Sequence, residues 1–465
     1  MSAPAAQFEV ARREGRLAWS MGESQPLRLS DLVSALSYAL DLTGGQAQGW
    51  AVRSCWIGMR LADRIGLPAA ERADLYYALL LKDSGCSNNA ARVAQIFAAD
   101  DHEAKSRSLL VDWYGLSWAG LMTAVRVAGR DDAWPRRLQR LAAMGLRRRR
   151  DAREVITLRC ERGAGIARRM GFSEASARAV RSLDERWDGR GAPDGLRGEA
   201  IPLLARILRV AQTLALFPAD PAQGQQALER WRGRWFDPGL VKAARGLRAE
   251  AAAWAGLEAE ALRARVIALD PGQALEAGEA RLEAVCEAFA DVIDAKTPFT
   301  CRHSRGVAAA AGAIAAELGA DAATARALRR AALLHDIGKL GVSNRILDKP
   351  GPLTEGEWAQ VKLHPRYTRS ILEHVAGWRG LAFVAAAHHE RLDGSGYHLG
   401  LAAAELPKAA RVIAVADVYD ALAADRPYRP GLAREEVFRL LRREAPHALD
   451  AECVEALGCA LESKV

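Results

Sequence analysis

The stretch RRAALLHDIGKLGVSNRILDKPG, residues 329–351, decides how the last third of this chain folds. Its first part, up to Leu334, has the apolar spacing of a buried helix face. The next two residues, His335 and Asp336, are polar, and burying them without partners would cost on the order of a few kcal/mol each. Imidazole and carboxylate groups are both metal ligands. The stretch therefore predicts a helix that ends at a metal site inside a helical core.

The composition of the 465-residue chain favours helices over sheets. Half of the residues are hydrophobic and 6% are aromatic. The chain is rich in Ala, Leu, Arg and Glu, and it lacks the long alternating Val, Ile and Thr segments that sheets need. Its length suits two or three domains. We therefore expect an all-α protein with two tandem helical domains joined by a helical connector.

The charge and the cysteines exclude several classes of protein. A net charge of +8 is mild for this length, and it suits a small anionic substrate without indicating nucleic acid or a membrane surface as a partner. The basic run from Arg147 to Arg150 is typical of a solvated helix face. The seven cysteines contain no Cys-x-x-Cys pair, which favours a reducing compartment. The N-terminus is charged and no apolar run of about 18 residues exists, so we expect a cytoplasmic protein without a membrane span.

Histidines gather in the last third of the sequence. Eight of the nine follow residue 300, and these are His303, His335, His364, His374, His388, His389, His398 and His447. Apolar residues at three- and four-residue steps predict helices over 279–295, 304–318, 367–388 and 408–424. Thr354 and Glu357 predict a capping box at the start of another helix. The histidine-rich third therefore combines a helical framework with an unusual number of metal-binding side chains.

Seven polar residues of this third are candidate metal ligands: His303, His335, Asp336, His364, His388, His389 and Asp417. Neighbouring helical residues point about 100° apart, so His335 and Asp336 can flank a site with more than one cation, and an aspartate can bridge two cations. These ligand types suit Fe, Mn, Zn, Co or Ni. The alternative is that each residue is hydrogen-bonded separately in the core, which is disfavoured because charged groups are rarely buried unpaired.

Three motifs resemble those of the HD-GYP phosphodiesterases, a branch of the HD phosphohydrolase superfamily that hydrolyses cyclic dinucleotides, chiefly cyclic di-GMP. They are HDIGK at 335–339, HHERLDGSGYH at 388–398 and ADVYDALAADRPYR at 416–429, within a similarity that covers about residues 280–445. The resemblance implies that the seven candidates bind metal, with Asp336 bridging. It also implies that Lys339 contacts the scissile phosphate and that Arg426, Arg429, Gly394 and Tyr397 contact the substrate.

The sequence departs from the family pattern at three places. The GYP triplet reads Gly396-Tyr397-His398, and the HPxxG motif has Thr368 in place of its glycine. Some relatives hold a third metal with a glutamate where this chain has Phe299. We therefore expect two divalent transition-metal ions, Fe or Mn before Zn, Co or Ni.

The first half of the chain contains a second, degenerate copy of the same pattern. Residues 49–86 match 302–339, and residues 182–213 match 387–418, with equal spacings inside each pair. In the first copy Trp50, Lys82, Leu183, Asp184 and Gln212 replace His303, His335, His388, His389 and Asp417, and of the ligand set aligned in this way only the aspartate remains, as Asp83. This copy is not expected to hold two metals, and a packing, dimerisation or sensing role is left open.

These observations predict four segments and one leading function. The segments are an N-terminal tail (1–27), a degenerate HD-like domain (28–250), a helical connector (251–275) and a catalytic HD-GYP-like domain (276–465). The leading function is hydrolysis of cyclic di-GMP to linear pGpG or GMP in second-messenger signalling. The alternatives are a dinucleotide-sensing and docking module, or a phosphohydrolase for another nucleotide such as cyclic GMP-AMP. A homodimer and a diguanylate-cyclase-type partner are the expected protein interactions.

Overall fold

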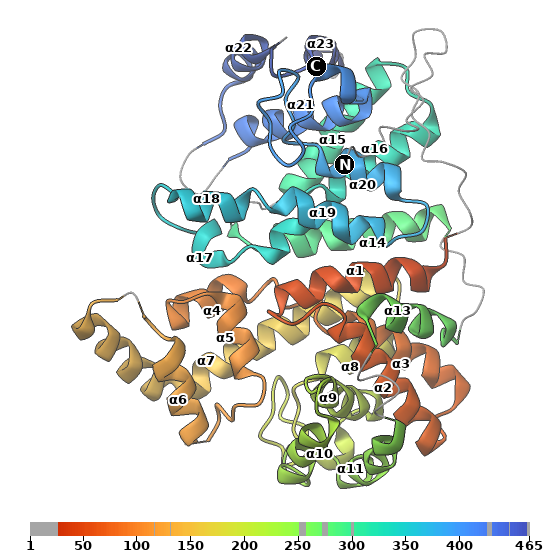
Figure 1. Cartoon of the computed structure of the whole chain (residues 1–465), viewed down its shortest axis with the longest axis vertical. Coiled ribbons are helices and arrows are strands. Elements are labelled where there is room, and N and C mark those ends of the chain that lie inside the picture. Colours follow the sequence, from red (N-terminus) through yellow and green to blue (C-terminus); the bar gives the residue numbers. More distant parts are fainter. Residues whose placement is uncertain are drawn as a thin grey trace. The chain divides into compact units, whose positions relative to one another are not determined.

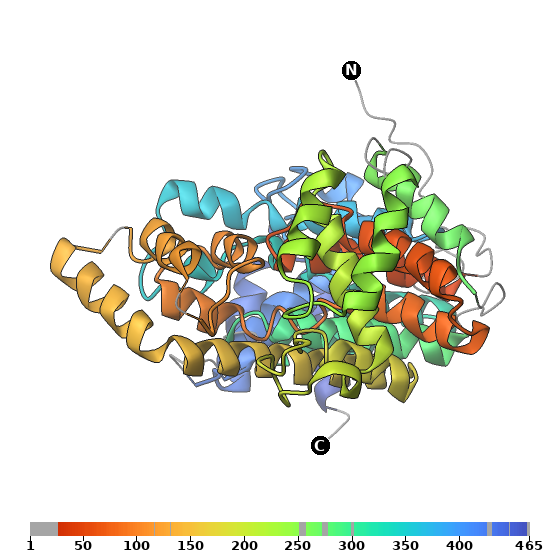
Figure 2. The same ribbon diagram turned by 90° about the horizontal axis from the view of Figure 1, so that it is seen from below.

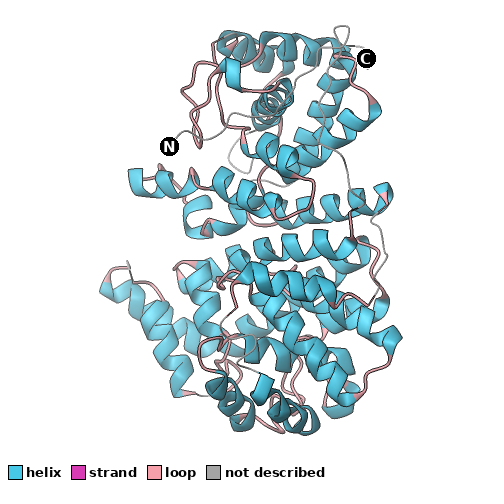
Figure 3. Cartoon of the chain, turned by 45° about the vertical axis from the view of Figure 1, so that its right-hand side comes forward, coloured by secondary structure: helices cyan, strands magenta, loops and turns pink. Residues whose placement is uncertain are grey.

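The computed structural model describes residues 27–115, 117–130, 132–250, 257–271, 278–298, 302–425, 430–445 and 447–462. Within these residues the regular elements are helices joined by loops, which confirms the all-α prediction (Figure 3). None of the helices in this part of the chain is long and apolar enough to cross a membrane. The predicted helix over 367–388 is wrong. It is two helices, separated by a turn in which Gly377 adopts a φ of +75°, a left-handed conformation that ends helices.

The chain forms two compact units, and the boundary between Ala288 and Phe289 lies inside helix α14. The N-terminal unit contains residues 28–288 and the short segment 343–351. Its helices are α1 (Leu29–Thr43), α2 (Trp50–Ile65), α3 (Ala69–Leu81), α4 (Ala90–Phe97), α5 (Asp101–Ser108), α6 (Trp118–Val127), α7 (Trp134–Arg169), α8 (Glu174–Arg181), η1 (Gly198–Ala200), α9 (Leu203–Ala215), α10 (Pro221–Arg230), α11 (Pro238–Arg245), η2 (Gly246–Glu250), α13 (Ala259–Ala268), most of α14 (Glu279–Asp294), and α17 (Asn344–Leu347).

The C-terminal unit contains residues 289–342 and 352–465, described as far as residue 462. Its helices after α14 are α15 (His303–Glu317), α16 (Ala322–Leu334), η4 (Ile337–Gly341), α18 (Glu355–Val361), α19 (His364–Glu373), α20 (Arg379–Ala386), η5 (Ala403–Glu405), α21 (Lys408–Ala423), α22 (Arg434–Glu444) and α23 (Ala451–Glu462). Thr354 and Glu357 form the predicted capping box at the start of α18.

The same helix pairings occur in both units. In the N-terminal unit α2 packs against α3 and α9, and α8 packs against α3, α7 and α9. In the C-terminal unit α15 packs against α16 and α21, and α20 packs against α16, α19 and α21. Five helices of each unit therefore correspond in order, and the internal repeat seen in the sequence has a structural counterpart.

The loop that follows α8 or α20 also repeats. Glu185 accepts hydrogen bonds from three backbone N–H groups of its loop, at Asp194, Gly195 and Leu196. Glu390 accepts them from Leu399 and Leu401 in the other unit. In each loop a buried carboxylate therefore folds the backbone around itself.

The N-terminal unit differs from the C-terminal unit by an insertion between α3 and α7. Helices α4 and α6 pack against the 36-residue helix α7, and α5 packs against α4 and α6 (Figures 1 and 2). Val93, Phe97, Ala104, Val127 and Met144 form a small hydrophobic core among them. This insertion forms one wall around the centre of the repeated helices.

Candidate metal centre

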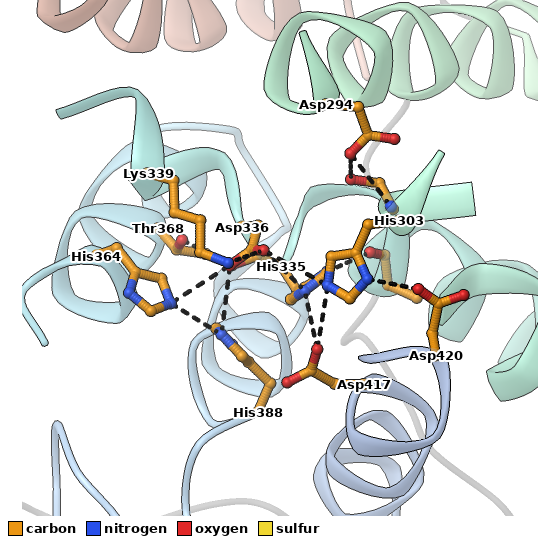
Figure 4. Close-up of polar contacts among 12 residues, drawn as sticks. Asp294, His303, His335, Asp336, Lys339, His364, Thr368, His388, Asp417 and Asp420 are labelled. Carbon is orange, nitrogen blue, oxygen red and sulfur yellow. Dashed lines mark hydrogen bonds and ion pairs between the residues drawn. The ribbon is translucent and has the colours of Figure 1, made fainter. Parts of the chain in front are cut away.

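The C-terminal unit brings all seven candidate ligands together, and Figure 4 labels all of them except His389. They come from separate elements: His303 begins α15, His335 and Asp336 follow α16, His364 begins α19, His388 and His389 follow α20, and Asp417 lies within α21. All are buried except His389, whose side chain is 23% exposed. The centre is thus assembled by the packing of five helices, and no single segment of sequence contains it.

Three of the histidines are oriented by the same hydrogen bond. The Nδ1 atoms of His335, His364 and His388 each lie 2.7 Å from the carbonyl oxygen three residues earlier in the chain. A carbonyl only accepts, so Nδ1 carries the proton and Nε2 presents its lone pair to the centre. Burial lowers the pKa of His364 to about 3, and burial together with His389 lowers the pKa of His388 well below its usual value. Both rings are therefore neutral, as metal ligands must be.

Asp336 lies between two groups of ligands. Its Oδ1 is 3.3 Å from Nε2 of His364 and 3.6 Å from Nε2 of His388, whereas its Oδ2 is 3.3 Å from Nε2 of His335. On the Oδ2 side, Nε2 of His303 lies 3.2 Å from Oδ1 of Asp417. The two carboxylate oxygens therefore face different ligand sets, which is the arrangement of a bridging carboxylate.

The centre fits bound cations because it gathers several acceptor atoms, with Lys339 as a donor at its rim. Nε2 of His335 and Oδ1 of Asp336 are buried and have no hydrogen-bond partner within the described residues. Nε2 of His364 and Nε2 of His388, both lone-pair atoms, are 3.0 Å apart. Burial opposes the charge on Asp336, but positive charge at His335, whose own pKa Asp336 raises, and at Lys339 holds the pKa of Asp336 well below its usual range. A cation bound at Nε2 of His335 would take the place of that proton. A buried cluster of anionic and lone-pair atoms is stabilised by a cation.

Lys339 reaches the centre from its rim. Its Nζ lies 2.5 Å from Oδ2 of Asp336, and its side chain remains 20% exposed. The spacing of three residues along η4 makes this contact possible. The ammonium group is thus placed where an anionic ligand that enters the centre would meet it.

Sequence reasoning missed three residues that position the ligands. Oδ2 of Asp420 lies 2.6 Å from Nδ1 of His303 and fixes the orientation of that ring. Asp294 accepts hydrogen bonds from the backbone and hydroxyl of Ser304 at the start of α15. Asp420 was detectable, because it lies one helical turn after Asp417 and shares its face.

Thr368, the residue that replaces the family glycine, is the third. Its hydroxyl donates to the carbonyl oxygen of His335 at 2.8 Å and accepts from the backbone N–H of Gly338 at 3.0 Å. A Cβ at Gly338 would lie 1.9 Å from the carbonyl oxygen of His364. The turn after α16 therefore packs directly on α19, and Thr368 ties the two together.

Tyr397, one of the loop residues predicted to contact the substrate, lies beside the centre. The ring of Tyr397 packs on that of His389, with centroids 4.6 Å apart and planes tilted by 32°. Gly394 adopts a φ of +76°, and His398 a φ of +100°. Proline cannot adopt a positive φ, so a proline would not fit the backbone that His398 has here. Arg426, Arg429 and Phe299 lie outside the described residues.

The N-terminal unit has cations of its own at the equivalent positions. A Cβ at Gly85 would meet the carbonyl oxygen of Arg159, as one at Gly338 would meet that of His364. Arg159 therefore stands where His364 stands, a correspondence that the sequence comparison did not find. Lys82 is fully buried and pairs with Asp83.

Comparison with known proteins agrees with this geometry. The profile of the HD domain family matches residues 132–240 and 287–453, which together are more than half of the chain. The 3'3'-cGAMP-specific phosphodiesterase 3 of Vibrio cholerae is 42% identical over 437 residues, or 93% of this chain and 94% of that protein. The chain belongs to the HD-domain family, whose phosphohydrolases are metal-dependent.

Two further relatives narrow the class. The crystal structure of the cyclic GMP-AMP-specific phosphodiesterase V-cGAP3 of V. cholerae covers 94% of this chain and 98% of its own, with a TM-score of 0.63 and 36% identity. The cyclic di-GMP phosphodiesterase response regulator RpfG of Xanthomonas campestris is 40% identical over 150 residues, 32% of this chain and 39% of that protein. The protein is a phosphodiesterase of the HD-GYP type, in which an HD-GYP unit follows a second HD-type unit.

Proposed function

We propose that this protein hydrolyses a cyclic dinucleotide, 3'3'-cyclic GMP-AMP before cyclic di-GMP. The observation that carries the reaction class is the complete set of seven candidate ligands, Asp336 among them, all buried except His389. We place 3'3'-cGAMP before cyclic di-GMP because of the share of the chain that each relative matches. The relative that matches nearly the whole chain is named for 3'3'-cGAMP, whereas RpfG, named for cyclic di-GMP, matches about a third of it. Sequence analysis alone placed cyclic di-GMP first.

We assign the ligands to two cations that share Asp336. His364, His388 and His389 would hold one, and His303, His335 and Asp417 the other. Fe and Mn suit this imidazole and carboxylate set, with Zn, Co and Ni as alternatives. When bound, such a pair of ions supplies an acidified water and charge stabilisation for a phosphodiester.

The chain's own residues then hold and polarise the substrate. Lys339 places its ammonium group at Asp336, where it can neutralise a phosphoryl oxygen as charge develops on it. Tyr397 covers the ring of His389 and offers an aromatic face to a base. The neutral Nε2 atoms of His364 and His388 keep the centre ready for cations without a prior proton loss.

A dinucleotide-sensing module is the second candidate function, because the N-terminal unit has replaced its ligands. The complete ligand set of the C-terminal unit favours the enzyme. The predicted homodimer and cyclase-type partner stay predictions.

The test uses the purified full-length protein, loaded in turn with Mn or Fe, and a panel of 3'3'-cGAMP, cyclic di-GMP and cyclic di-AMP. Products are separated by chromatography, with Asp336→Asn as the control. We expect turnover of at least one guanine-containing dinucleotide, fastest with 3'3'-cGAMP, and none with the control. Metal-loaded protein that turns over no member of the panel would favour the sensing module.

A further inference from the structure

A cavity of about 200 Å³ occupies the centre of the N-terminal unit, where the C-terminal unit holds its ligand cluster. Trp50, Asp83, Arg159, Asp184 and Gln212, which are equivalent to five of the metal-centre positions, line it. Loss of the ligands has therefore left a space at this centre. The space is walled on one side by the insertion that the C-terminal unit lacks.

The cavity wall contains guanidinium groups that are paired with carboxylates and lie close to one another. Asp184 pairs with two guanidinium groups, those of Arg159 and Arg209. Arg186 adds a third, held at 3.0 Å by Asp112 and at 2.9 Å by Asp188. Burial, followed by the charges of Arg159 and Arg186, lowers the pKa of Arg209 to about 10. An anion placed beside these guanidinium groups would relieve their mutual repulsion.

Several polar atoms of the wall have no partner. Nε of Arg209, Oε1 of Gln212, the hydroxyl of Tyr114 and Nε1 of Trp235 are buried and make no hydrogen bond within the described residues. Gln212 is 5% exposed and Trp235 is 4% exposed. All four side chains line the cavity. Buried polar groups are nearly always satisfied, so these atoms indicate a bound group with both acceptors and a donor.

The remaining wall is apolar and includes several aromatic rings. Trp50, Trp113, Tyr114 and Trp235 all line the cavity, and the guanidinium groups of Arg186 and Arg209 lie 5.2 and 5.5 Å from the ring centre of Trp235. A cavity of roughly 150 Å³ encloses a benzene ring. The space is therefore large enough for a planar ring but too small to enclose two nucleotides.

We propose that this cavity is a ligand site for a small planar anion of the nucleoside monophosphate class, with its ring among the tryptophans and its charge at Arg159 and Arg209. The site is separate from the metal centre and needs no metal. Occupancy would satisfy the orphan atoms of Arg209, Gln212 and Trp235 and would couple the N-terminal unit to nucleotide concentration.

The test is calorimetric titration of the full-length protein with 5'-GMP, in an Asp336→Asn background that weakens the metal centre. Guanosine and inorganic phosphate are separate probes for the ring and the charge. Arg209→Gln removes one charge, and Ala152→Phe fills the cavity without touching an ion pair. Arg190→Gln, an exposed residue that does not line the cavity, is the matched control. Thermal melting reports whether each variant is folded.

We expect 5'-GMP to bind, and guanosine and phosphate each to bind at least about tenfold more weakly, since each makes only part of the contacts. Arg209→Gln and Ala152→Phe should each weaken 5'-GMP by about tenfold or more, and Arg190→Gln by less than about twofold. If the Arg209→Gln variant does not fold, the affinity of the Ala152→Phe variant for 5'-GMP tests the proposal. Absence of binding at millimolar 5'-GMP, binding unchanged by Ala152→Phe, or phosphate as tight as 5'-GMP would overturn the proposal.

Discussion

Equivalent helices of the two units surround different side chains: mainly imidazole groups in the C-terminal unit, and ammonium and guanidinium groups in the N-terminal unit. In the C-terminal unit, Asp336 contacts one ammonium group, that of Lys339, and otherwise faces imidazole nitrogens that we expect to bind metal ions. In the N-terminal unit, Asp83 and Asp184 face Lys82 and Arg159, which belong to the chain. The comparison teaches that this fold keeps acidic groups at its centre and that either metals or side chains can balance them.

The two solutions have different consequences for binding. A metal centre leaves open coordination positions that a substrate can use. Lys82 instead places its ammonium 3.2 Å from the ring centre of Trp50, which satisfies the cation by a cation–π contact. The N-terminal centre therefore balances Asp83 with a side chain of the chain itself, which leaves its cavity available for the ligand proposed above.

The largest expected effect comes from replacing the equivalent aspartates, Asp336 and Asp83, by asparagine in separate variants. Asp336→Asn should lower kcat by on the order of a thousandfold or more, because it removes the carboxylate shared by both ligand sets. Asp83→Asn should change kcat by less than about threefold, because no ligand set depends on it. Steady-state hydrolysis of 3'3'-cGAMP measures both, with circular dichroism to confirm folding. Equal losses in two folded variants would refute the division between the units.

Removing Lys339 should have the next largest effect. Lys339→Met should lower kcat on the order of a hundredfold with a smaller change in KM, because its oxygen partner gains charge only during the reaction. Lys339→Arg keeps the charge and should recover part of the rate. If KM rose while kcat stayed the same, Lys339 would be a ground-state contact only.

Replacing Lys82 tests the role of the ion pair in the N-terminal unit, and the measured quantity is the free energy of unfolding. Lys82→Met leaves Asp83 buried without its partner and should reduce the stability of the N-terminal unit by about 3–5 kcal/mol. The double variant Lys82→Met with Asp83→Asn should recover a large part of this loss. Denaturant unfolding followed by tryptophan fluorescence measures both, and a single variant as stable as the parent would contradict the assigned ion pair.

The smallest expected effect concerns Thr368. Thr368→Val removes the hydroxyl between His335 and Gly338 and should reduce stability of the C-terminal unit by about 1–3 kcal/mol, because a buried N–H loses its acceptor. Thr368→Ser retains the hydroxyl and should cost less. Urea unfolding of the two variants decides the case, and identical midpoints would mean that the bridge does not contribute.

Much of the framework could be predicted because it follows from local pattern. Helices α14, α15 and α21 begin and end within one residue of the ranges expected from apolar spacing. Residues 367–388 were predicted as one helix and not two, because their apolar spacing continues through Gly377, where the backbone turns. Periodicity alone does not show that a glycine takes a left-handed conformation.

The sequence analysis predicted the candidate metal ligands, but it did not predict the residues that hold these ligands in position. The candidate ligands are residue types that are rare in apolar surroundings, and the resemblance to the HD-GYP motifs identified them as one set. Arg159 is an ordinary charged residue in a charged stretch, so only its contacts distinguish it, whereas the spacing of Asp420 from Asp417 was a signal that the sequence analysis did not use. The orphan atoms of Gln212 and Trp235 are a property of the packed structure and leave no trace in sequence.

The most direct test of the central claim, that one unit holds metal and the other replaces it with side chains, is the metal content of three full-length proteins. Elemental analysis of the parent, Asp336→Asn and Asp83→Asn should find about two transition-metal ions per chain in the parent and in Asp83→Asn, and far less in Asp336→Asn. Metal retained by folded Asp336→Asn and lost from folded Asp83→Asn would contradict the account.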